Sequence, residues 1–124
     1  MKIERFEDIK AWQEARVLVN MIYDTIKSNK DFTGDYKFRE QIQSAAVSAI
    51  SNIAEGFSRR STKEFVQFLF IAKGSVAEVQ SQLYIALDQG YINEEKFNEL
   101  YSKSDEVARL ISGFIQYLLN NNKR

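Results

Sequence analysis

Hydrophobic residues recur at intervals of three and four positions along most of this chain, the spacing of one face of an α-helix. The recurrence falls into four segments and predicts helices over residues 7–29, 35–56, 61–89 and 93–120. No segment shows the strict alternation of a half-buried strand. Long helices with short connections alternate in direction. The sequence therefore predicts an all-α fold, an antiparallel up-down-up-down four-helix bundle built as a single domain over residues 1–124.

One apolar stripe on each helix supplies the expected core. The first helix contributes Trp12, Ala15, Val19, Ile22 and Ile26. The second contributes Ile42, Ala46, Ala49 and Ile53. The third contributes Phe65, Leu69, Ala72, Val76, Val79, Leu83 and Ala86. The fourth contributes Phe97, Leu100, Ser104, Val107, Ile111, Phe114 and Leu118, with one polar member.

Capping residues stand at the expected helix ends. Asp35 opens the second helix, and Asn93 precedes the fourth. Ser61 with Glu64 three residues later has the form of a capping box at the start of the third. Gly56 follows the second helix, where we expect a left-handed cap.

The second and third helices are apolar over more than one stripe. No charged residue occurs from Gln41 to Ala54. A single bundle would leave this surface exposed, which favours burial between subunits of a homo-oligomer. The alternative is an uneven monomer in which these two helices are central. For the oligomer we expect the interface to include large apolar and small residues, namely Ala45, Ala49, Phe70, Gly74, Ala77 and Tyr84.

Polar residues also lie on these two apolar helices. Ser48, Asn52 and Glu55 share one face of the second helix, and Ser75 and Glu78 share a face of the third. One interpretation is an acid/base pair or carboxylate metal site formed by the two glutamates. The other is a hydrogen-bonded layer that fixes helix register or subunit geometry, and we favour it because a metal site lacks a third ligand.

Basic residues cluster at the turn between the second and third helices. Arg59, Arg60 and Lys63 would lie near a helix N-terminus, where an anion or an RNA phosphate binds favourably. The alternative is a solvated loop without a ligand.

Composition removes most enzyme chemistry. The chain has no histidine and no cysteine, so it has no imidazole base, no thiol nucleophile and no ligand set for a zinc site. We therefore expect no catalytic residues, no cofactor and no metal. Seventeen basic residues balance seventeen acidic ones, which gives no long-range field to attract nucleic acid. Neither a signal peptide nor a membrane span is recognisable, so we expect a cytoplasmic protein.

Three motifs resemble one family over nearly the whole chain. They are Phe6-x-Asp8-Ile9-x-x-Trp12-Gln13, then Ala45-Ala46-Val47-Ser48 followed by Ser51-Asn52-Ile53-Ala54-Glu55-Gly56, and Phe68-Leu69-x-Ile71-Ala72-x-Gly74-Ser75-x-x-Glu78. The family is that of the four-helix bundle proteins first named for reading frames in intervening sequences of bacterial 23S rRNA genes. Retroelement accessory variability proteins are similar.

The resemblance implies a homo-oligomer, typically a pentameric ring, without enzymatic activity. It also implies, for the accessory relatives, binding of nucleic acid and a reverse transcriptase through a basic surface. This chain departs from the family, which usually carries two arginines and a later proline where Gln43, Ser44 and Ile50 stand here. Loss of these cations weakens RNA binding, and loss of the proline predicts a straighter helix.

Two functional hypotheses follow. The first is a non-enzymatic homo-oligomeric scaffold or interaction module, with a pentamer as the expected assembly. The alternative is an RNA-binding accessory protein that uses Arg59, Arg60 and Lys63 repeated around a ring.

Overall fold

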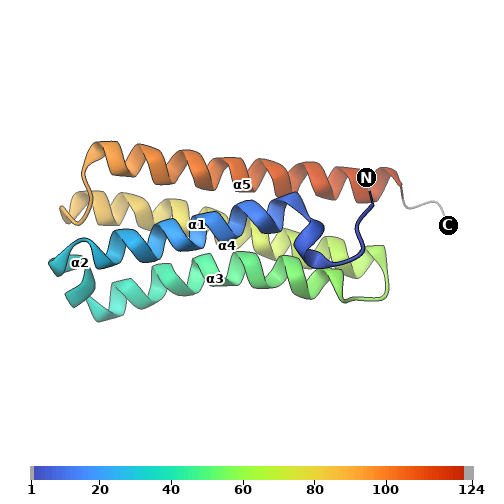
Figure 1. Ribbon diagram of the computed structural model, residues 1–124, viewed down its shortest axis with the longest axis horizontal. Coiled ribbons are helices and arrows are strands. Elements are labelled where there is room, and N and C mark those ends of the chain that lie inside the picture. The colour runs from blue at the N-terminus through green and yellow to red at the C-terminus, as the bar shows by residue number, and fades with distance from the viewer. Residues whose placement is uncertain (1, 122–124) are drawn as a thin grey trace.

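Helices form nearly all of the structure, a computed structural model that describes residues 2–121. In chain order they are the 3-10 helix η1 (Phe6–Asp8) and the α-helices α1 (Lys10–Lys27), α2 (Lys30–Gly34), α3 (Tyr36–Phe57), α4 (Thr62–Asp88) and α5 (Glu94–Asn120). Figure 1 shows the four long helices side by side, with no strand among the described residues. The predicted all-α bundle is confirmed.

The long helices form a closed ring of neighbours. Helix α1 packs against α3 and α5, and α4 packs against the same two helices from the opposite side. Each helix thus lies beside the one that follows it in the chain, with the direction reversed, as Figure 1 shows. The arrangement is the expected up-down-up-down bundle, in which α1 and α4 are diagonal.

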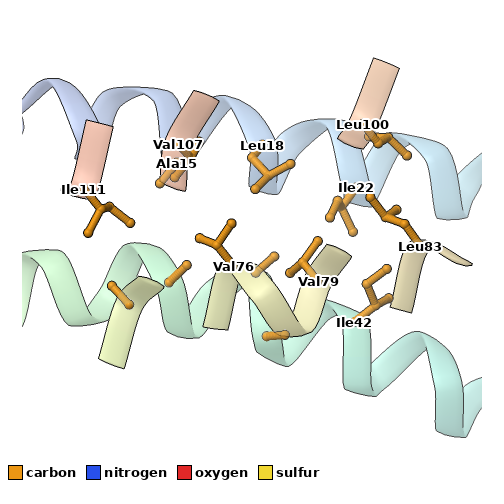
Figure 2. Packing of buried hydrophobic residues seen from close by; sticks show 14 of the residues in the cluster. Ala15, Leu18, Ile22, Ile42, Val76, Val79, Leu83, Leu100, Val107 and Ile111 are labelled. Carbon is orange, nitrogen blue, oxygen red and sulfur yellow. The ribbon is translucent and has the colours of Figure 1, made fainter. Parts of the chain in front are cut away.

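The core lies along the axis of this bundle. Figure 2 shows side chains from all four long helices meeting there, among them Leu18 of α1, Ile42 of α3, Leu83 of α4 and Ile111 of α5. The predicted stripes of α3 and α4 are buried almost throughout. The polar member of the α5 stripe, Ser104, is fully buried and donates a hydrogen bond to a backbone carbonyl of its own helix. The hydroxyl therefore keeps a hydrogen-bond partner although it is buried.

The predicted first helix, over residues 7–29, is wrong at both ends. Ile9 is extended (φ −78°, ψ 121°) and separates η1 from α1, so that the ring of Phe6 packs edge-on against Trp12 with centroids 5.1 Å apart. At the other end Asn29 accepts a hydrogen bond from the backbone N–H of Phe32 and starts α2. The break brings the Phe32 ring into the core.

Three of the predicted caps form as expected, and the first is Asp35, whose side chain accepts a hydrogen bond from the backbone N–H of Phe38. The Ser61 hydroxyl accepts a hydrogen bond from the backbone N–H of Glu64, and the Asn93 side chain accepts one from that of Lys96. The expected left-handed cap at Gly56 is wrong, because this residue lies within α3, which ends one residue later. A Cβ atom there would lie 2.8 Å from Cβ of Phe68, so the glycine permits close approach of α3 and α4. The glycine with a left-handed backbone conformation is Gly90, after the end of α4, with φ of 76°.

Helix α3 continues without a break through Ile50, as the missing proline predicts. Within residues 2–121, no helix combines the length and the apolar character that crossing a membrane would require.

Candidate functional site

The outward face of α4 carries large apolar side chains that the rest of residues 2–121 does not cover. Phe70 is 55% exposed and Tyr84 is 52% exposed, and they lie fourteen residues, or about four turns, apart on the same face. Gly74 and Ala77 lie between them and are also exposed. Ile71 and Ile85, each about half exposed, widen the face. Four of the six residues predicted for an oligomer interface therefore share one accessible surface, the α4 face.

The other two predicted interface residues do not reach that surface. Ala45 is 4% exposed and Ala49 is fully buried, because both point into the bundle. Their small side chains allow α3 to lie close to its neighbours. A second copy of the chain would not contact them, so their assignment to the interface is wrong. The exposed apolar residue in this part of α3 is Val47.

The orientation of Tyr84 is fixed by α5. Its ring packs on Phe97 with centroids 4.8 Å apart and meets Tyr101 edge-on at 6.0 Å. Aromatic pairs at such distances contribute about 0.5–1.5 kcal/mol beyond the area they bury. The exposed half of Tyr84 is thus held in place on the α4 face.

The polar residues of α3 and α4 form a hydrogen-bonded layer. The hydroxyl oxygens of Ser48 and Ser75 lie 2.9 Å apart, across the contact between the helices. The Asn52 side-chain amide donates to the backbone carbonyl of Ser48 at 2.8 Å and to its hydroxyl at 3.1 Å. Because Ser75 is only 8% exposed, this network satisfies polar groups that the bundle buries.

The two glutamates of the polar layer lie apart. Glu55 accepts a hydrogen bond from the Arg59 guanidinium at 2.7 Å, whereas Glu78 lines a hollow with Lys37 and Ser44. The helices are antiparallel, so the glutamates fall on opposite sides of the Ser48 contact, about 15 Å apart along the axis. Residues 2–121 contain no group of three His, Cys, Asp or Glu side chains arranged to hold a metal ion. The geometry fits the structural layer and does not form an acid/base pair.

The basic residues at the α3–α4 connection are only partly free. The Arg59 guanidinium is bound to Glu55 and lies 4.5 Å from the centroid of the Phe68 ring. Arg60 is exposed and forms no ion pair within residues 2–121. Lys63 is exposed on the first turn of α4.

A hollow of about 370 Å³ opens beside this connection. Residues that line this cationic hollow include Lys2, Arg59, Arg60, Ser61, Phe65 and Phe114. Lys63 does not line it, so the structure brings together two of the three predicted basic residues. Lys2 comes from the N-terminal segment, to which sequence analysis assigned no role. The sequence gives a weak signal for this role of the N-terminal segment, because Lys2 and Ile3 precede the first apolar stripe.

A partly buried ion pair connects α1 to α5. Lys103 Nζ lies 2.5 Å from Glu14 Oε1, and both side chains are less than one-fifth exposed. Hydrogen bonds from Lys103 and then from Lys10 lower the pKa of Glu14 below its ordinary value. The bond to Glu14 raises the pKa of Lys103. Both members of the pair bind further charged partners, Lys10 at Glu14 and Glu106 at Lys103, so we assign the pair a role in holding the helices together.

These features define a class of protein: a four-helix bundle with one uncovered apolar face and polar residues arranged for structure. A family model named 23S rRNA-intervening sequence protein matches residues 7–113, and the chain belongs to that family, as its motifs predicted. No curated protein matches the chain. Among solved structures, the chain is similar to a protein of unknown function from the S23 ribosomal protein family of Bacteroides thetaiotaomicron VPI-5482. The identity is 21% and the TM-score 0.78, over 85% of this chain and 97% of that one, a likeness that shows the fold.

Proposed function

We propose that the protein is a non-enzymatic homo-oligomer, most simply a pentameric ring, that acts as a scaffold or interaction module. The observation that carries this proposal is the exposed α4 face, with Phe70 and Tyr84 each more than half exposed. Exposed apolar surface of this kind is unfavourable in a monomer and is typical of interaction sites. The ring of five copies is what the resemblance to the family implies.

Gly74 supports the same proposal. Glycine inside a helix costs about 1 kcal/mol relative to alanine. No atom outside the local helix backbone lies within 4 Å of the position that a Cβ would occupy at Gly74, so the bundle itself does not need the missing side chain. A helix of a second copy crossing α4 at this point would approach closely because of it.

The oligomer is tested by sedimentation and light scattering of the full chain. We expect Phe70→Asp and Tyr84→Asp to shift the assembly to monomers that remain helical, because each buries a charge in the interface. Val17→Asp is the matched control, since Val17 is 41% exposed on α1, diagonal to α4. A monomeric wild-type protein at micromolar concentration would contradict the proposal.

A second candidate function is RNA binding by a nucleic-acid accessory protein, in the context of rRNA intervening sequences or of a reverse transcriptase. Two observations favour it: the family name includes 23S rRNA, and Arg60 is exposed without an ion pair among residues 2–121. Arg59, Arg60 and Lys63 would repeat around a ring. The balanced charge of the chain, with Gln43 and Ser44 on α3, weakens this candidate.

RNA binding is tested by titrating structured RNA at several salt concentrations. Phosphate contacts predict binding that weakens steeply with salt. An Arg60→Gln, Lys63→Gln double variant should reduce both the affinity and the slope of that dependence. Lys27→Gln, at the far end of the bundle, is the control. Absence of binding at low salt rules this function out.

A further inference from the structure

A second hollow adjoins the cationic hollow at the end of the bundle where the N-terminal segment passes α5. Figure 1 shows the N-terminal segment, the end of α5 and the α3–α4 connection gathered at this end. The second hollow has a volume of about 250 Å³. Residues that line this apolar hollow include Ile3, Ile9, Leu110, Gly113, Phe114 and Tyr117. Ile3, Phe114 and Tyr117 line both hollows, so the two compartments lie on either side of the same side chains.

Every charged side chain that is described in the lining of these compartments is basic. Lys2, Arg59 and Arg60 line the cationic hollow, and Lys10 and Arg109 line the rim of the apolar one. The carboxylates that pair with the rim cations belong to Glu14 and Asp105, and neither residue lines either of these two hollows. Lys2 and Arg59 are also paired, with Glu4 and Glu55, so among residues 2–121 Arg60 is the lining cation that has no carboxylate partner and is available to an anion.

We propose that the two compartments bind a small amphipathic anion, with a hydrocarbon body in the apolar hollow and a carboxylate or phosphate monoester against Arg60. Arg60 is the lining cation without an ion pair among residues 2–121, so binding an anion breaks no existing contact there. Thr62 lines the same compartment and can supply a neutral hydroxyl donor, whereas the Ser61 hydroxyl already donates to the Glu64 carboxylate. This proposal is independent of the oligomer.

The lining of the apolar hollow selects a hydrocarbon over a nucleobase. Apart from the two rim cations, its side chains are apolar, and the Tyr117 hydroxyl is the polar exception. A base placed there would leave most of its polar edge without partners, which costs free energy. An apolar cavity of about 150 Å³ already holds benzene, so the larger hollow has room for a somewhat longer body.

Gly113 lines the apolar hollow without a side chain. It lies within α5, and a Cβ built on it would meet no atom outside the local helix backbone within 4 Å. The helix would form more readily with almost any other residue at this position. A leucine there would add side-chain atoms to the lining of the hollow, starting from a Cβ position that meets no neighbouring atom.

The test is calorimetric titration of the full chain with octanoate, octyl phosphate, octanol and inorganic phosphate. We expect one site per chain for at least one of the two anions, and the stronger binder identifies the head group. Gly113→Leu should weaken that binding tenfold or more, whereas Gly113→Ala should leave it within a few-fold. Arg60→Gln should weaken the binding of the anions by about tenfold, which is the range of a charge-assisted hydrogen bond. It should leave the affinity for octanol unchanged. Lys27→Gln is the control for charge.

Three results would overturn the proposal. The first is no saturable binding of either anion, and the second is unchanged binding in Gly113→Leu. The third is inorganic phosphate bound as tightly as octyl phosphate, with sensitivity to Arg60→Gln alone, which would assign the surface to phosphate or nucleic acid. Circular dichroism establishes that each variant is folded. Loss of the oligomer in Phe70→Asp leaves this test intact, because the hollows lie outside the α4 face.

Discussion

The hydroxyl of Tyr91 donates a hydrogen bond of 2.7 Å to the Asp35 carboxylate, and so connects the α4–α5 turn to the start of α3. The other oxygen of Asp35 accepts from the backbone N–H of Phe38, which caps α3. The Tyr91 ring stacks on Phe32 with centroids 5.1 Å apart. One aspartate therefore holds together a helix end and a turn that are 56 residues apart in the sequence.

Tyr91→Phe should lower the Tm by a few degrees, because it removes the hydrogen bond and keeps the ring. The hydrogen bond to Asp35 raises the pKa of the Tyr91 phenol. A group whose pKa is higher in the folded state than in the unfolded state stabilises the fold at pH values below its unfolded pKa. This stabilisation is lost as the pH rises through the folded pKa. The wild type should thus lose more stability than Tyr91→Phe above about pH 10. Thermal unfolding from pH 7 to 11 measures this, with Tyr36→Phe as the exposed control.

Glu14→Gln should lower the free energy of unfolding by about 1 kcal/mol at neutral pH, since Glu14 binds both Lys103 and Lys10. The pKa of Glu14 is lowered in the folded state. Its contribution is therefore complete above the unfolded pKa, about 4.3, and disappears as pH falls through the lower folded value. Urea unfolding at pH 7 and at pH 3 should show a smaller difference between the wild type and the variant at pH 3 than at pH 7.

Glu106→Gln provides the comparison for this ion pair. Glu106 also contacts Lys103, at 3.0 Å, but its side chain is 47% exposed. Solvent screens such a pair, and its removal should change stability much less. Equal losses in the two variants would contradict the structural role of the α1–α5 pair.

Much of the core could be predicted because burial in a bundle follows helical spacing. Ala72, Val76 and Val79 of α4 were assigned to the core from spacing alone and are fully buried. Ser61 and Asn93 were assigned as caps from residue type, since their side chains act within the next three residues. Helical spacing and residue type were sufficient to predict these features, because both act over a few neighbouring residues.

Features that depend on distant contacts were not predictable. Ile9 interrupts a segment with helical spacing, because Phe6 packs on Trp12 and the chain must turn to allow it. Ala45 was assigned to an outer face, although a position two residues along the helix, Val47, is the exposed one. The distinction depends on where α1 and α4 lie around α3, which the spacing of one helix does not specify.

The candidate surfaces show the same division. The α4 face was predictable because Phe70, Ala77 and Tyr84 recur at helical spacing beyond the core stripe. The pair of hollows was not, since Lys2, Arg60 and Gly113 come from three remote segments. Only the packed bundle brings them to one end.

The contact between Ser48 and Ser75 predicts a measurable coupling. Ser75→Ala should cost about 1 kcal/mol, because it leaves the Ser48 hydroxyl with one partner fewer in a partly buried layer. The double variant Ser48→Ala, Ser75→Ala should lose less free energy of unfolding than the sum of the losses in the two single variants. Glu78→Gln is the control, since Glu78 lies outside this network of hydrogen bonds. Additive losses in urea unfolding would exclude a direct interaction.

Two glycines inside helices should respond oppositely to the same substitution. Gly56→Ala should destabilise the protein by about 1–3 kcal/mol, because its Cβ would lie 2.8 Å from Cβ of Phe68 and 2.9 Å from the Phe65 ring. Gly113→Ala should stabilise it by up to about 1 kcal/mol, since the new methyl group meets nothing and the helix gains propensity. Neither glycine has a positive φ, so backbone strain does not contribute to the comparison. Chemical denaturation of both variants decides the matter, and a stabilising effect at Gly56 would show that α3 and α4 separate more easily than their packing indicates.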